Sequence, residues 1–75
     1  MNKNKKEIFI KFGQNIRAFR KERDMTILEL SKITGIRTQY LKKIEAGNAY
    51  GMSSTCIFIF AKAFNIKPHE VVKGI

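Results

Sequence analysis

The chain has 75 residues, which suits one domain with a compact core and leaves little room for a large catalytic cleft. Its 15 Lys and Arg outnumber 6 Asp and Glu, so the favoured partners are polyanions, either nucleic acid or an anionic membrane surface. The single cysteine, Cys56, excludes an intramolecular disulfide, and without a second thiol or a companion histidine it cannot form a metal site.

The first predicted helix runs from about Lys5 to Arg23, because apolar residues recur there at spacings of four, four and three. They are Ile8, Phe12, Ile16 and Phe19. The opposite face is basic, and such a run is most often a solvated surface. Residues 1–6 are expected to be flexible.

A second predicted helix follows Thr26, whose hydroxyl can accept from the amide of Glu29 while the Glu29 carboxylate accepts from the Thr26 amide. Met25 and Leu30 complete this start as a hydrophobic pair. The helix is short, because Gly35 can take the left-handed conformation that ends a helix.

The third predicted helix runs from Arg37 or Thr38 to about Ala46, and Gly47 ends it. The spacing of Leu41 and Ile44 turns both inward. The outward side chains are those of Thr38, Gln39, Lys42 and Lys43.

The fourth predicted helix begins after Ser53 and reaches Phe64. The β-branched and aromatic residues from 55 to 60 also suit a strand, but the chain offers no partner strand. Pro68 fits the first turn of a fifth helix, His69 to Lys73, with Val71 and Val72 closing the core. The expected fold is therefore all-α, with five helices.

Two short helices joined by a glycine turn, the second exposing polar residues at its start, form a geometry that presents side chains to DNA base edges. Small helical bundles also contain such hairpins. Periodicity and charge alone leave both interpretations open.

The residues of two segments, 12–20 and 26–47, resemble the Cro and lambda-repressor-like helix-turn-helix family, also called the Xre family. The closest resemblance lies from Gly35 to Gly47, over the turn, the recognition helix and a closing Glu-x-Gly. It continues weakly through residues 61–66. The resemblance implies one compact five-helix domain over residues 1–75, with the helix-turn-helix at about 26–47.

The family resemblance also implies a function. It indicates a small transcription regulator or repressor that binds double-stranded operator DNA as a homodimer in the cytoplasm, on the nucleoid of a prokaryote or on phage DNA. No cofactor, metal, membrane or enzymatic activity is expected.

The resemblance places the third helix in the major groove, with Thr38, Gln39, Lys42 and Lys43 at the base-contacting positions. A glutamine can pair with adenine through two hydrogen bonds, and a lysine can donate to guanine. The same four residues would otherwise be a solvated helix face.

Phosphate contacts are expected on both sides of that helix, where the family uses two helix starts and one loop. These places hold Thr26, Ile27, Asn48, Tyr50 and Ser53, and the side chains of Arg37 and Tyr40 add to them. Exposed amides at helix starts attract phosphate, so Thr26, Ile27 and Ser53 can contribute through the backbone. Arg20 and Glu45 correspond to a family pair that orients the third helix.

The chain departs from the family pattern at three positions. Ile27 stands in place of a glutamine that braces a phosphate, Arg37 replaces the usual Ser or Thr cap, and Met52 replaces a frequent proline. Without a cap at Arg37, the third helix is expected to begin at Thr38.

The fourth helix is unusually apolar, with Phe58 and Ile59 at positions where the family carries polar residues. The first helix or the tail beyond Val72 could cover them, but a homodimer interface is preferred. An antitoxin-like module that binds a protein partner here is the alternative function. Membrane attachment through the basic first helix is disfavoured by its interspersed acidic residues, and the lone His69 offers no catalytic pair.

Overall fold

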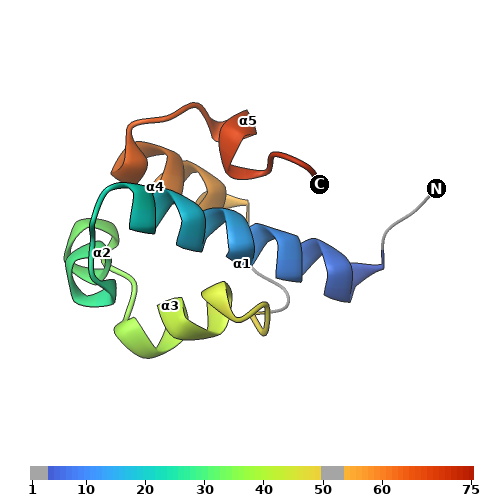
Figure 1. Ribbon diagram of the computed structural model, residues 1–75, viewed down its shortest axis with the longest axis horizontal. Coiled ribbons are helices and arrows are strands. Elements are labelled where there is room, and N and C mark those ends of the chain that lie inside the picture. Colours follow the sequence, from blue (N-terminus) through green and yellow to red (C-terminus); the bar gives the residue numbers. More distant parts are fainter. Residues whose placement is uncertain (1–3, 50–53) are drawn as a thin grey trace.

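The computed structural model describes residues 4–49 and 54–75. Within these ranges the chain is all-α, as expected, and forms five helices: α1 (Lys5–Glu22), α2 (Ile27–Thr34), α3 (Thr38–Glu45), α4 (Thr55–Phe64) and α5 (Pro68–Val71). α1 crosses the molecule and contacts α3, α4 and α5, and Figure 1 shows α3 on one side of it with α4 and α5 on the other.

The start of α1 is determined by Asn4, whose side-chain oxygen accepts a 2.8 Å hydrogen bond from the Glu7 amide. Because this cap precedes Lys5, the residues Lys5 and Lys6 are helical. Lys5 and Lys6, which fall within the start of the chain expected to be flexible (residues 1–6), are thus part of α1. Residues 1–3 lie outside the described ranges.

The ambiguous segment from residue 55 is a helix, as predicted, because its buried residues follow helical spacing. Phe60, Ala61 and Phe64 are buried on one face. The expected cap Ser53 lies outside the described ranges. α5 begins one residue earlier and ends two residues earlier than the predicted His69 to Lys73.

Apolar side chains from all five helices form one core, in which seven residues are fully buried: Ile16, Leu30, Leu41, Ile44, Phe60, Phe64 and Val71. The Phe60 ring lies 6.0 Å from the Phe12 ring in an edge-on arrangement and 6.1 Å from the Phe64 ring in a stacked one. Such pairs stabilise a core beyond the area that they bury.

One polar side chain of α1 and one at its C-cap attach this helix to the C-terminal half of the chain. Asn15, which is buried, donates through Nδ2 to the carbonyl oxygens of Val71 and Lys73 at 3.0 and 2.8 Å. The Arg23 guanidinium lies 5.5 Å from the Phe19 ring and 5.3 Å from the Phe64 ring, and Nε donates to the Phe64 carbonyl. α1 is thus the helix on which the others are assembled.

Candidate nucleic-acid interface

The start of α2 has the capping box that the sequence predicts. The Glu29 amide donates to the Thr26 hydroxyl oxygen at 3.0 Å, and the Thr26 amide donates to the Glu29 carboxylate at 2.8 Å. The first bond of the helix itself runs from the Leu30 amide to the Thr26 carbonyl. The donors that remain for a ligand are the amides of Ile27 and Leu28 and the Thr26 hydroxyl, because the Thr26 amide is occupied.

Three hydrogen bonds hold the turn between α2 and α3, two donated by backbone amides and one by a side-chain hydroxyl. Gly35 has a φ of +76°, as expected for a helix-ending glycine, and its amide donates to the Ser31 carbonyl at 2.8 Å. The Ser31 hydroxyl donates to the Ile36 carbonyl, and the Ile36 amide donates to the Thr34 hydroxyl. Neither Ser31 nor Thr34 was predicted to have this role, although hydroxyl residues around a glycine turn are a local signal for such bonds.

α3 begins at Thr38, as the absence of a Ser or Thr cap suggests. Arg37 occupies the cap position with an extended backbone and makes no side-chain capping bond. Leu41 and Ile44 are buried, and their burial leaves Gln39, Lys42 and Lys43 exposed to solvent. Thr38 is half-buried.

The outward face of α3 is cationic and lacks free carboxylates. Gln39 and Lys43 are four residues apart and line a shallow depression together with Arg37 and Tyr40. The one acidic residue of the helix, Glu45, lies on its α1 side and is already paired. This arrangement leaves hydrogen-bond donors and positive charge facing outward.

Arg20 and Glu45 form the ion pair that the resemblance implies. Arg20 donates through Nε to Oε2 of Glu45 at 2.7 Å and through a terminal nitrogen to Oε1 at 3.0 Å. Its other terminal nitrogen donates to the Met25 carbonyl at 2.8 Å. The two side chains are only 13% and 9% exposed, and the hydrogen bond to Glu45 raises the pKa of Arg20 above its ordinary value. The end of α3 is therefore attached to α1 and to the start of α2 through one guanidinium.

Gly13 provides a second attachment between α1 and α3, a role that was not predicted for it. A Cβ atom at this position would overlap the Ile44 carbonyl oxygen and lie 3.0 Å from that of Glu45. Only glycine permits the two backbones to approach so closely. A glycine inside a predicted helix was the available signal for a close contact.

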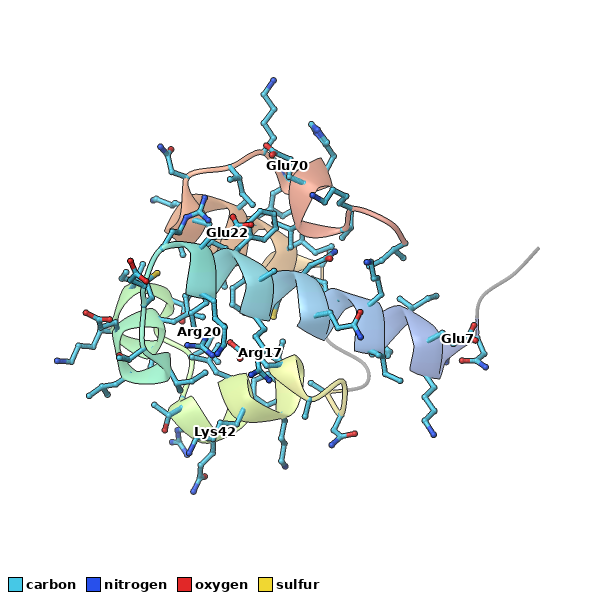
Figure 2. The ribbon with its side chains drawn as sticks, viewed as in Figure 1. Glu7, Arg17, Arg20, Glu22, Lys42 and Glu70 are labelled. Atoms are coloured by element: carbon cyan, nitrogen blue, oxygen red, sulfur yellow. The ribbon has the colours of Figure 1, made fainter. Side chains whose placement is uncertain are left out.

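The remaining predicted phosphate contacts are only partly placed. Asn48 is exposed just beyond α3, and Arg37 and Tyr40 are exposed beside the predicted base-contacting residues. Tyr50, Met52 and Ser53 lie outside the described residues. Figure 2 labels Arg17 and Arg20 on α1 and Lys42 on α3.

The apolar residues of α4 differ in exposure. Phe58 is 60% exposed, whereas Ile59 is half-buried against α2, where it lines a hollow with Ile33 and Lys62. The described parts of α1 and of the C-terminal tail leave Phe58 uncovered. The apolar surface that prompted the dimer prediction is therefore present at Phe58 and partial at Ile59.

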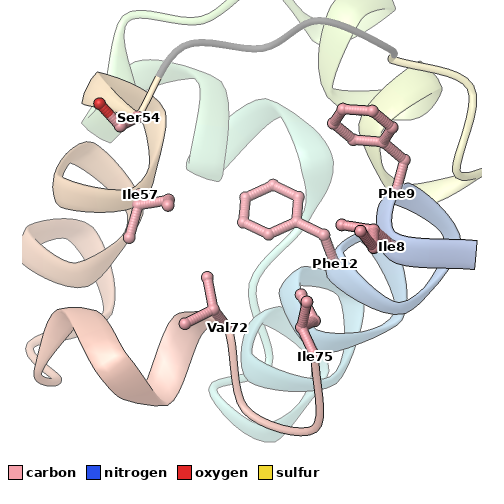
Figure 3. A pocket seen from close by; sticks show the side chains of 7 residues that line it. All are labelled: Ile8, Phe9, Phe12, Ser54, Ile57, Val72 and Ile75. Carbon is pink, nitrogen blue, oxygen red and sulfur yellow. The ribbon is translucent and has the colours of Figure 1, made fainter. Parts of the chain in front are cut away.

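A separate apolar pocket of about 250 Å³ lies between α1, the start of α4 and the C-terminal residues (Figure 3). Its lining side chains include Ile8, Phe12, Ile57, Val72 and Ile75, and none of the lining residues is titratable. No group of three metal-ligating side chains occurs among the described residues, where Cys56 is a free thiol. No helix within the described ranges is long and apolar enough to cross a bilayer.

Comparison with known proteins identifies the family. A family model described as Helix-turn-helix matches residues 16–71. Antitoxin PezA of Streptococcus pneumoniae serotype 4 is 35% identical over 60 residues, or 80% of this chain, which spans only 37% of that relative's length. The restriction-modification controller protein C.AhdI from Aeromonas hydrophila has a similar structure, with a TM-score of 0.77 and 28% identity over 84% of this chain and 94% of its own.

The family match extends from α1 to the end of α5 and so includes the capping box, the glycine turn and the Arg20–Glu45 pair. The similar solved structure has the same fold and is a controller protein. The chain belongs to the helix-turn-helix family of the Cro/C1 type, whose members are DNA-binding transcription regulators and not enzymes.

Proposed function

We propose that this protein binds specific operator sequences in double-stranded DNA, with α3 in the major groove and Gln39 as the main base-contacting residue. The observation that carries the proposal is the outward face of α3, where Gln39, Lys42 and Lys43 are exposed and unneutralised while the opposite face is fully buried. A helix that is packed firmly against the core and exposes side-chain amide and ammonium donors is suited to hydrogen bonding with adenine and guanine.

The phosphate contacts in this proposal lie on both sides of α3. On one side are the free amides at the start of α2 and the Thr26 hydroxyl. On the other side the predicted contacts are Asn48 and, outside the described residues, Tyr50 and Ser53, and Arg37 and Tyr40 lie at or beside α3 itself. Because Ile27 cannot donate from its side chain, more of the affinity comes from backbone amides and from lysines.

The experiment that tests this function is selection of bound sequences from a random duplex library, followed by affinity measurements on the selected site and its single-base variants. Gln39→Ala is expected to reduce the preference among bases at one position, by about 1–3 kcal/mol. Gln14→Ala, which removes the same side chain from an exposed site on α1, is the control and keeps the preference.

Two outcomes would contradict the proposal. If no sequence is enriched, the protein is not a specific DNA-binding protein. If Gln39→Ala lowers affinity equally on all sequences, Gln39 does not contact bases.

A homodimer is the second part of the proposal, because two half-sites about 34 Å apart match two symmetric copies of α3. The exposed Phe58 and its neighbour Ile59 supply an apolar surface for that contact. The alternative function is binding of a different protein at this surface by an antitoxin-like module, and the relative PezA is an antitoxin. Repression in the cytoplasm remains part of the same proposal.

A further inference from the structure

We infer that Arg17, on α1, binds a backbone phosphate of the duplex beside the groove that α3 occupies. The inference rests on the proposed function and extends it to the basic first helix, which none of the predicted contacts uses. Arg17 is exposed, and its position relative to α3 follows from the residues one turn before and after it.

Gly13, Arg17 and Arg20 follow one another at spacings of four and three, so they lie along the same side of α1. The first of them touches the backbone of α3, and the last is bonded to Glu45 on α3. The Arg17 side chain therefore leaves α1 on the side that faces α3, and Figure 2 shows it between the two helices, near Arg20.

The Arg17 guanidinium differs from that of Arg20 in having no carboxylate to bind. Both oxygens of Glu45 accept from Arg20, and the neighbours of Arg17 one turn away on α1 include the cation Lys21 and no acid. The ion pairs among the described residues join Arg20 to Glu45 and Arg23 to Glu22. Arg17 thus adds an uncompensated charge on the side of α1 that faces α3.

An uncompensated cation at the surface attracts a polyanion such as the DNA backbone. The planar guanidinium is suited to a phosphate, which it can bind through two parallel hydrogen bonds. A phosphate is a better partner than a base edge, because α3 lies in the groove and α1 lies behind it. The structure therefore assigns Arg17 a contact that adds affinity without sequence preference.

The test compares the salt dependence of binding for the wild type, Arg17→Ala and Arg17→Lys on the selected operator and on an unrelated duplex. Each phosphate contact contributes about 0.9 to the slope of log affinity against log salt concentration. Arg17→Ala is expected to lower that slope by about 0.9 per bound chain on both duplexes, while Arg17→Lys keeps the wild-type slope.

The matched control is Lys67→Ala, which removes one exposed charge next to α5, on the side of α1 opposite α3. It is expected to leave the slope unchanged. Circular dichroism confirms that each variant is folded.

An unchanged slope in Arg17→Ala, or a loss confined to the operator, would overturn the inference while leaving the proposed function intact. An equal loss from Lys67→Ala would also overturn it, because net charge alone would then explain the effect. Failure of the wild type to prefer any sequence would instead contradict the proposed function.

Discussion

At the scale of single residues, Gly13 is the position that tolerates least change. Its hydrogen faces carbonyl oxygens of Ile44 and Glu45, so any side chain would force α1 away from α3. Gly13→Ala is expected to lower the free energy of unfolding by about 1–3 kcal/mol, the usual cost of overpacking. Urea unfolding measures this, with Gln14→Ala as the control one residue away in solvent. An unchanged midpoint for Gly13→Ala would mean that the two backbones are further apart than described.

Contacts of this kind show which parts of the site the sequence could predict. The capping box at Thr26 and the turn at Gly35 were predicted correctly because they involve residues three or four apart. The backbone contact at Gly13 joins residues about thirty positions apart, and no local pattern specifies its partner. The Arg20–Glu45 pair was predicted only through family resemblance, for the same reason.

At the scale of helices, one buried amide bonds α1 to α5 and the C-terminal segment. Asn15 Nδ2 donates to two carbonyl oxygens of the C-terminal segment, at Val71 and Lys73, from a buried position. Asn15→Asp replaces this donor with a carboxylate oxygen that repels both carbonyls. The expected loss at neutral pH exceeds the roughly 1–3 kcal/mol that an unsatisfied buried group costs.

The loss in Asn15→Asp should shrink as the pH falls. Burial and the facing carbonyls favour the protonated acid, so the folded-state pKa of the introduced carboxyl lies above its unfolded value. The penalty is present above that folded-state pKa and fades below it, as the acid regains a donor. Urea unfolding at several pH values checks this, with exposed Asn48→Asp as the control. A loss independent of pH would contradict the assigned hydrogen bonds.

The predicted helix boundaries agree with the structure at the start of α1 and differ from it at both ends of α5. α1 begins at Lys5, as predicted, and Asn4 caps it, whereas α5 begins at Pro68 and ends at Val71 instead of running from His69 to Lys73. α4 was correctly predicted as a helix, although the β-branched content of its first half argued for a strand. Its burial against α1, α2 and α5 decides the outcome, and burial of that kind is a property of the fold.

At the scale of the whole molecule, the exposed ring of Phe58 is the feature that a dimer would explain. Phe58→Glu is expected to give a folded monomer in sedimentation velocity, because a charge at an apolar interface loses its hydration. Leu28→Glu is the control, since Leu28 is 56% exposed on a different helix. A wild-type protein that stays monomeric at high concentration, both free and on DNA, would contradict the dimer.

The two attachments of α3 to α1 lie at the same end of that helix, at Ile44 and Glu45. A tilt of α3 about its C-terminal turn would therefore move mainly its N-terminal residues, Thr38 and Gln39. Thr38 lies seven residue steps, or about 10 Å, from Glu45, so a tilt of α3 by about 10° about its C-terminal turn moves Thr38 by about 2 Å. That distance separates a good hydrogen bond from none. In the proposed DNA complex, the rigidity of the contacts at Gly13 and between Arg20 and Glu45, which lie away from the bases, limits how accurately bases are distinguished.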